Sequence, residues 1–392
     1  MENINVLGMI SQDFSCIFDI LKVFVDNIKR GSKKAEYGQD DGRNTFFTTS
    51  FLQDISVFVY EMIKIIPDIK TAVEPELVGD DFFGDLKKVR NAIHIREKGS
   101  FENRAKSIIE NIESCFENSH YDVSLLYRIT KPNATFLSSN VYYYHMTGKI
   151  GDIMAGAAIK NYSQNLSMII KCVSQMFTKL NYIIPTVNCP QFATMQIETF
   201  DYTIESLSKR TGLSKTSDVR FMLMHSYVSF INMFFELINA DKLIELDDCW
   251  LFFLAKLYSI RYTEIMDSFD SFDAHITGEE KAVITDLLEF KGFDRKEVLR
   301  NFAKKLRDLI HYELLPNFPP IFKSGEYYVD IEQVYLNSVG LQSIYEFKEL
   351  FYALRFDMKM MQLRFGRLFN LDSRVEDLPL KLARGGKTLV AR

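Results

Sequence analysis

The most informative segment of this chain reads Lys304-Lys305-Leu306-Arg307-Asp308-Leu309-Ile310-His311-Tyr312. Its pattern recurs without a gap in Lys87-Lys88-Val89-Arg90-Asn91-Ala92-Ile93-His94-Ile95, at a constant offset of 217 positions. In both copies two lysines, an aliphatic residue, an arginine, a short polar residue, two apolar residues and a histidine follow in the same order. Either copy alone is typical of an amphipathic helix, but the repetition predicts a duplicated unit.

Helical spacing gives each copy a polar stripe and an apolar face. Positions i, i+3 and i+7 share one side of a helix that turns about 100° per residue. The two polar stripes are Lys87, Arg90 and His94 in the first copy and Lys304, Arg307 and His311 in the second. The two apolar faces are Leu86, Val89 and Ile93 in the first copy and Phe302, Leu306 and Ile310 in the second. Each helix is therefore expected to present cations and a histidine at the edge of a buried surface.

The rest of the chain favours helices. It has only 9 prolines, and apolar residues recur with a helical period through most long segments. The expected helices include 4–28, 48–66, 82–98, 159–184, 197–207, 218–239, 248–267, 294–315 and 341–369. A loop is expected at 31–44, and a short extended piece at 326–331. The sequence thus predicts an all-α fold with minor short β segments.

Composition limits the classes of protein that fit. With 392 residues the chain is long enough for two or three domains, and its net charge of −5 argues against coating nucleic acid over the whole surface. The five cysteines are scattered and lack metal-ligand spacing, which indicates free thiols in a reducing compartment. No signal peptide or membrane-spanning run is evident. We expect a cytoplasmic protein.

The paired motifs have the chemistry needed to act on a phosphodiester. Arginine offers a planar fork for phosphate oxygens, and histidine titrates near neutrality and can move a proton to or from a ribose oxygen. Lysines beside them, Lys87, Lys88, Lys304 and Lys305, would attract RNA. No zinc pattern, phosphate loop, dinucleotide fingerprint or serine-nucleophile elbow is present. We therefore expect no metal or cofactor.

These residues carry a family resemblance. Arg90-Asn91 with His94, and Arg307-Asp308 with His311, resemble the Arg-polar…His signature of HEPN domains, with a shorter Arg-to-His spacing than the family usually has. HEPN domains are helical bundles that pair so that two motifs meet in one cleft. Many are metal-independent ribonucleases in toxins, abortive-infection systems and CRISPR effectors.

The resemblance implies two HEPN-like bundles in tandem that form an intramolecular pseudo-dimer. The first unit would span 1–125 and the second 196–370, with a connecting region at 126–195 and a polar tail at 371–392. Arg90 and Arg307 would hold phosphate, and His94 and His311 would transfer protons. Asn91 and Asp308 would support the arginines. RNA would be the substrate, and an antitoxin or another defence-complex subunit a possible protein partner.

Two alternatives stay open at this point. A helical module of the same architecture could bind RNA or a partner protein without catalysis. Internal duplication could also preserve the motif for structure alone, in which case each arginine pairs with an acid on a facing helix and each histidine caps a carbonyl. The segment 267–275 could be a divalent-ion site, but its pattern fits a solvated helix end better.

Overall fold

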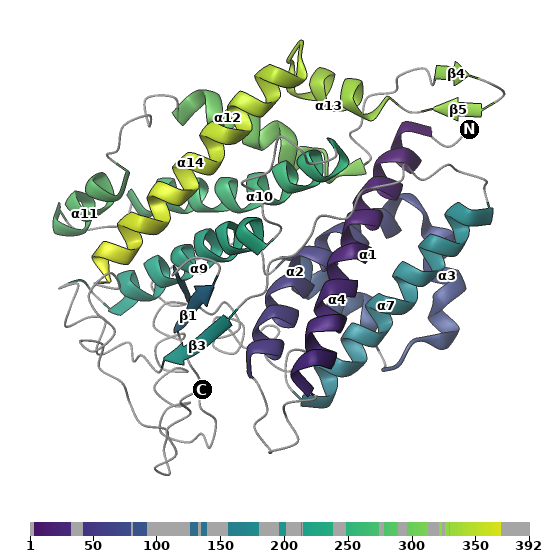
Figure 1. The fold of residues 1–392 in the computed structure, drawn as a ribbon, viewed down its shortest axis with the longest axis horizontal. Coiled ribbons are helices and arrows are strands. Elements are labelled where there is room, and N and C mark those ends of the chain that lie inside the picture. Colours follow the sequence, from purple (N-terminus) through teal and green to yellow (C-terminus); the bar gives the residue numbers. More distant parts are fainter. Residues whose placement is uncertain are drawn as a thin grey trace.

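A computed structural model describes residues 4–32, 42–79, 81–91, 126–131, 135–138, 156–179, 196–200, 213, 215–237, 248–273, 278–288, 296–312, 321–323, 326–328 and 330–369. This part of the chain is predominantly helical, which confirms the expected all-α class (Figure 1). Within it, no helix is both long and apolar enough to span a membrane.

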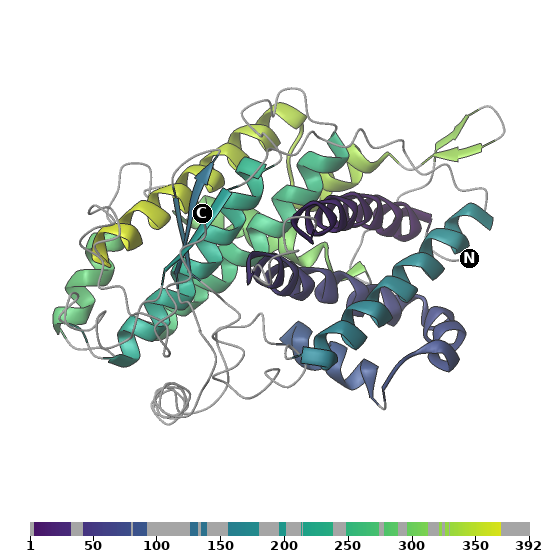
Figure 2. The same cartoon turned by 60° about the horizontal axis from the view of Figure 1, so that its bottom comes forward.

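The helices fall into two sets along the chain. The N-terminal helix set comprises α1 (Ile4–Ser32), α2 (Gly42–Ile65), α3 (Pro67–Val73), the short 3-10 helix η2 (Glu74–Glu76), α4 (Phe82–Asn91) and α7 (Gly156–Lys179). The C-terminal helix set comprises α9 (Lys215–Leu237), α10 (Asp248–Asp273), α11 (Gly278–Leu288), α12 (Lys296–Asp308), α13 (Ile331–Val339) and α14 (Ile344–Leu368). The two sets lie side by side in both views (Figures 1 and 2).

Short strands accompany the helices. They are β1 (Leu126–Lys131), β2 (Thr135–Ser138), β3 (Gln196–Phe200), β4 (Ile321–Lys323) and β5 (Glu326–Tyr328). The first three form an antiparallel sheet in the order β2-β1-β3, and the last two form an antiparallel ribbon. The helix expected at 197–207 is wrong in its first residues, because Ile197 to Phe200 pair with β1 as strand β3.

The two sets share an order of packing. In the N-terminal set α1 packs on α2, α2 packs on α4, and the short α3 packs on α7. In the C-terminal set α9 packs on α10, α10 on α12, and α11 on α14. In each set a pair of long helices is followed by a short helix and then by the helix that carries the motif, and a further long helix comes later in the chain; the C-terminal set has the additional short helix α13 before that last one.

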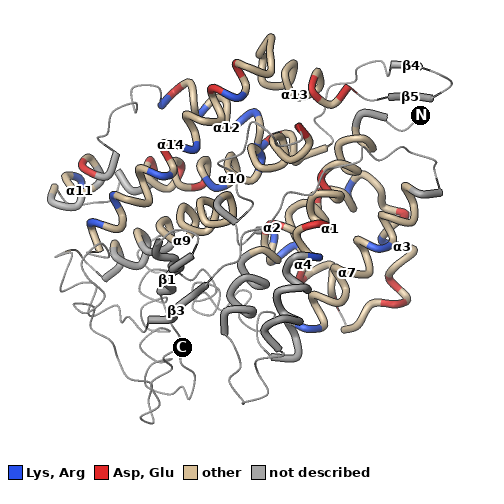
Figure 3. Tube along the Cα trace, in the orientation of Figure 1, with Lys and Arg blue, Asp and Glu red and all other residues tan. Residues whose placement is uncertain are grey.

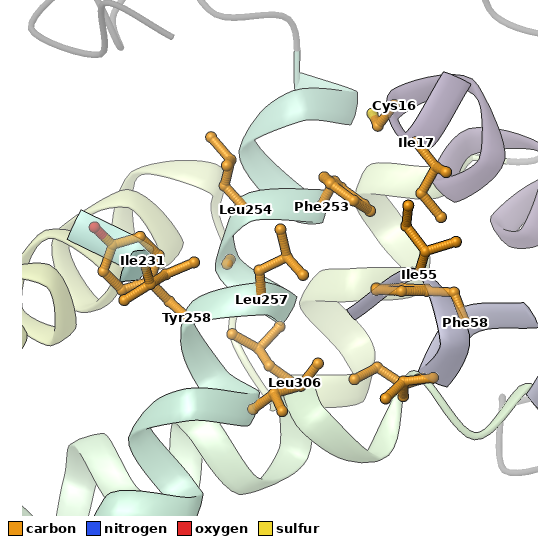
Figure 4. Close-up of a cluster of buried hydrophobic side chains, with 14 of the residues drawn as sticks. Cys16, Ile17, Ile55, Phe58, Ile231, Phe253, Leu254, Leu257, Tyr258 and Leu306 are labelled. Atoms are coloured by element: carbon orange, nitrogen blue, oxygen red, sulfur yellow. The ribbon is translucent and has the colours of Figure 1, made fainter. Parts of the chain in front are cut away.

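Helix α10 belongs to the C-terminal set, borders the N-terminal set and is buried on all sides. Every residue from Cys249 to Met266 is buried, as expected for a helix with neighbours all round. Its neighbours include α1 from one set and α9, α12, α13 and α14 from the other. Figure 4 shows Ile55 and Phe58 of α2 close to Phe253 of α10. One continuous core therefore joins the two sets.

Candidate functional site

The first motif helix, α4, is positioned by its apolar face. Phe82, Leu86 and Val89 are buried, and α4 packs against α2. The expected apolar face is thus confirmed at Leu86 and Val89. Lys87 and Lys88 are exposed on the other side, where Lys88 pairs with Asp85 at 2.9 Å. His94, Ile93 and the side chain of Asn91 lie outside the described residues.

The second motif helix, α12, ends earlier than its spacing predicts. The expected helix ran to residue 315, but α12 ends at Asp308. The chain then tightens into a turn, in which the N–H groups of Ile310 and His311 donate to the carbonyls of Arg307 and Asp308 at 3.0 Å. His311 therefore lies in this turn instead of on the helical stripe with Lys304 and Arg307. The buried face is confirmed at Phe302, Leu306 and Ile310.

A buried polar cluster anchors the turn. Tyr312 follows His311 and is fully enclosed, and its hydroxyl donates to Oδ2 of Asp13 on α1 at 2.8 Å. Lys256 of α10 donates to the same carboxylate. Burial raises the pKa of Tyr312 and lowers the pKa of Lys256. Because Tyr312 is tied to α1, the preceding residue His311 is directed toward the N-terminal helix set.

Glu61 of α2 joins the two motifs. Its Oε1 accepts hydrogen bonds from Nε and Nη2 of Arg90 at 3.2 and 3.0 Å. Its Oε2 lies 3.0 Å from Nδ1 of His311 and 3.1 Å from Nζ of Lys64. The Glu61 side chain is only 1% exposed, whereas those of Arg90 and His311 are 19% and 27% exposed. One buried carboxylate thus holds an arginine from the first motif and the histidine of the second.

The environment keeps Glu61 ionised. Burial alone would raise the pKa of its carboxyl group. The hydrogen bond and charge of His311, the hydrogen bond of Lys64 and the charge of Arg90 outweigh burial and lower the pKa to about 2. The guanidinium of Arg90 also lies over the ring of Tyr60, 5.7 Å from its centroid. We name Glu61, Lys64, Arg90 and His311 the Glu61 cluster.

The described contacts of the remaining residues of the second motif are made outside this cluster. Arg307 donates through Nε and Nη2 to Oδ1 of Asp308, its neighbour in sequence, and no other partner occurs within the described part of the chain. Lys304 is exposed. Lys305 donates to the carbonyl of Val339 at the end of α13, at 2.9 Å. Lys and Arg alternate with Asp and Glu over the C-terminal helix set (Figure 3).

Glu61 is a site residue that the repeated motif does not contain. A signal for it exists, since Asp54 and Glu61 are acids seven positions apart in a segment that is otherwise apolar on that side. Both are buried, and both bind cations: Asp54 binds Arg261 and Glu61 binds Arg90. An acid at helical spacing inside an apolar segment indicates a buried partner.

The structure offers no metal centre among the residues it describes. In the segment 267–275, Asp267 and Asp270 lie at the end of α10 and bind Arg300 of α12, with Nη2 of Arg300 3.6 Å from Oδ1 of Asp267. His275 lies outside the described residues. His225 is enclosed beside Phe365 and Phe369, and burial lowers its pKa to about 3.

No family model, no curated protein and no solved structure matches this chain, so its function has to be inferred from the geometry of the Glu61 cluster.

Proposed function

We propose that the Glu61 cluster is the centre of a metal-independent endoribonuclease built from two HEPN-like helical bundles in tandem. The observation that carries the proposal is the meeting of Arg90 and His311 on one buried carboxylate, since these residues belong to the two copies of the repeated motif. The shared order of helix packing in the two sets supports the tandem arrangement. The resemblance extends the proposal to a cytoplasmic role in anti-phage or toxin-type defence.

The geometry of His311 suits proton transfer. A carboxylate 3.0 Å from Nδ1 fixes the orientation of the ring and leaves Nε2 as the nitrogen that can meet a substrate. In the described part of the chain Nε2 of His311 has no partner, and the side chain is partly exposed. His311 can therefore exchange a proton with a bound RNA while Glu61 holds it.

The proposed reaction needs only groups of this chain and the RNA itself. The ribose 2′-oxygen attacks the adjacent phosphorus, and the bond from phosphorus to the 5′-oxygen breaks. One histidine of the pair His94 and His311 accepts the 2′-hydroxyl proton, and the other donates a proton to the leaving oxygen. Arg90 and Arg307 stabilise the charge that grows on the phosphate. The products are a 2′,3′-cyclic phosphate and a 5′-hydroxyl.

The test is cleavage of mixed RNA by the purified full-length protein in EDTA. We expect cleavage to survive the chelator, to leave 2′,3′-cyclic phosphate ends and to spare DNA, which lacks the 2′-hydroxyl. Since one general acid or base contributes about 10²- to 10⁴-fold, His311→Ala and His94→Ala should each reduce the rate by that factor. Arg90→Lys and Arg307→Lys should also reduce the rate because lysine lacks the planar fork. His275→Ala, outside both motifs, is the matched control.

A second candidate function is a non-catalytic helical module that binds RNA or a protein partner. The observation that favours it is the pairing of Arg90 with an acid on a facing helix, which is the arrangement expected if the motif serves structure. Cleavage that requires added metal, or that is unchanged in the His94/His311 double variant, would exclude the proposed metal-independent site. Salt-dependent RNA binding lost in Lys87→Glu or Lys304→Glu would then support the binding module.

A further inference from the structure

Helix α14 has a second apolar face that points outward. Its buried face, which includes Phe347, Phe351 and Leu354, packs into the core. Yet four of the seven exposed large hydrophobic side chains in the described part of the molecule also lie on this helix. They are Tyr345 (79% exposed), Tyr352 (38%), Phe356 (50%) and Leu363 (45%).

These four side chains form one straight line along the helix. They stand at positions i, i+7, i+11 and i+18, which at about 100° per residue fall within roughly 40° of one another. At about 1.5 Å per residue the line is roughly 27 Å long. We name this line, with the exposed Glu349 and Lys359 that lie beside it, the α14 stripe. A row of exposed apolar side chains on one face of a helix is the arrangement that helix–helix contacts use.

The order of residues in the α14 stripe is symmetric about Leu354. Tyr345 and Leu363 are equally far from it, and so are Tyr352 and Phe356. The charged pair obeys the same rule, because Glu349 and Lys359 each lie five positions from the centre. The α14 stripe thus has two symmetric pairs of apolar residues and one symmetric pair of opposite charges, Glu349 and Lys359.

We infer that the α14 stripe binds the α14 stripe of a second copy of this chain, with the two helices antiparallel. A twofold axis at Leu354 then sets Tyr345 level with Leu363 of the second copy and Tyr352 level with Phe356. It also sets Glu349 level with Lys359, so that opposite charges flank the seam. A parallel pair would place Glu349 beside Glu349 and Lys359 beside Lys359, which is unfavourable. Charge complementarity therefore selects both the occupant and its direction.

The inference is independent of the proposed ribonuclease. The Glu61 cluster is made by α2, α4 and the turn after α12, and the α14 stripe contributes no residue to it. An inactive protein that dimerises would leave this inference intact, and an active monomer would leave the proposed function intact.

The experiment is sedimentation equilibrium of the full-length protein over a range of concentrations. We expect a mass that rises from 45.6 kDa toward twice that value as concentration increases. Phe356→Glu should weaken association at least tenfold. Val298→Glu, which makes the same change at an exposed apolar position of α12, should leave it unchanged. Circular dichroism verifies that each variant is folded.

A charge exchange tests the antiparallel register. Glu349→Lys alone and Lys359→Glu alone should each weaken association, because like charges then lie level across the seam. The two substitutions together restore opposite charges and should restore the dimer. A protein that stays at 45.6 kDa at every concentration, a dimer indifferent to Phe356→Glu, or a double variant without recovery would each overturn the inference.

Discussion

At the scale of single residues, Glu61 determines the geometry of the candidate site. It is enclosed, yet it carries a charge that contacts with Lys64, Arg90 and His311 stabilise. With a pKa of about 2 the carboxylate stays ionised throughout the physiological range, so it continues to hold Arg90 and His311 as the pH varies. A neutral side chain of the same shape would fill the same volume but would lose the charge interactions with these partners.

The first prediction follows from that pKa. Because the folded-state pKa of Glu61 lies below its ordinary value of 4.5, ionisation stabilises the fold above about pH 5, and this contribution is lost as the pH falls toward 2. Glu61→Gln should lower the free energy of unfolding by about 2 kcal/mol at pH 7. The difference from wild type should shrink steadily between pH 5 and pH 2.

Urea unfolding at several pH values measures this difference. Glu76→Gln, a change of the same kind at an exposed acid of η2, serves as control and should alter stability by less than about 0.5 kcal/mol. A gap between wild type and Glu61→Gln that stays constant down to pH 2 would show that the carboxylate charge is not what stabilises the cluster.

Spacing rules could predict part of this site and not the rest. The buried faces at Leu86, Val89, Phe302 and Leu306 follow from helical periodicity, because neighbouring turns of one helix define them. The partner of Arg90 does not follow, since Glu61 lies 29 positions away on another helix. Likewise, no glycine or proline marks the end of α12 at Asp308. We attribute that end to the bond between Tyr312 and Asp13, which no local pattern records.

At the scale of secondary-structure elements, the end of α13 shows how one helix can complete another. Gly340 adopts a left-handed conformation with φ of 78°, and Leu341 donates to the carbonyl of Leu336 at 2.8 Å. The ammonium of Lys305 on α12 caps the carbonyl of Val339. A cation and a glycine thus satisfy carbonyls that the end of a helix leaves open.

The second prediction concerns this junction. A Cβ at position 340 would lie 3.3 Å from Nζ of Lys305 and would require a backbone conformation that L-residues rarely adopt. Gly340→Ala should therefore lower the free energy of unfolding by about 1–2 kcal/mol. Gly278→Ala is the matched control, because an added Cβ there meets nothing within 4 Å and φ is not positive, so it should change stability by less than about 0.5 kcal/mol.

Thermal unfolding of the two variants measures their loss of stability relative to wild type. An effect of Gly340→Ala no larger than that of Gly278→Ala would mean that the end of α13 tolerates a side chain. Repeating the substitution in a Lys305→Met background separates the contact from the backbone: Gly340→Ala should cost less there than in wild type, because no Nζ then crowds the new Cβ.

Long segments are the easier ones to predict. The helices α1, α7, α9 and α14 lie within about five residues of their expected ends, and α10 runs six residues past its expected end at 267, because each repeats its apolar period over more than 20 residues. The nine-residue α13 and the eleven-residue α11 are not predicted, because the apolar pattern of two or three turns is hard to distinguish from that of a loop. Strand β3 was assigned to a helix because pairing with β1, and not local pattern, makes it a strand.

At the scale of the whole molecule, two buried ion pairs join the helix sets. Asp13 of α1 binds Lys256, and Asp54 of α2 binds Arg261 at 2.7 and 2.8 Å. Both cations come from α10, and aromatic rings surround them: Nζ of Lys256 lies 5.5 Å from the ring centroids of Phe58 and Tyr335. We expect these two buried pairs to specify the position of α10 relative to α1 and α2.

The third prediction compares one broken pair with one replaced pair. Lys256→Met leaves Asp13 enclosed without its cation and should cost about 3 kcal/mol or more. Asp13→Asn combined with Lys256→Met removes both charges and keeps an oxygen that can accept from Tyr312, so it should cost clearly less than the single change. Urea unfolding followed by the fluorescence of Trp250, the one tryptophan of the sequence, measures both.

A double variant less stable than Lys256→Met alone would contradict this account, because it would mean that the charge of Asp13 is stabilising even without its partner. Far-ultraviolet circular dichroism recorded in parallel tests whether the two helix sets unfold together. Coincident transitions are expected, since the core is continuous across α10.

The distribution of charge across the junction between the two helix sets determines how separated halves of the chain would associate. The acids of both pairs come from the N-terminal helix set and the bases from the C-terminal set. If the chain were cut between α7 and α9, each fragment would expose an apolar surface studded with charges of one sign. Neither fragment could associate with a copy of itself through that surface, because carboxylate would meet carboxylate, or ammonium would meet guanidinium. The two fragments would therefore associate with each other and not with copies of themselves, because only the mixed pair brings opposite charges together.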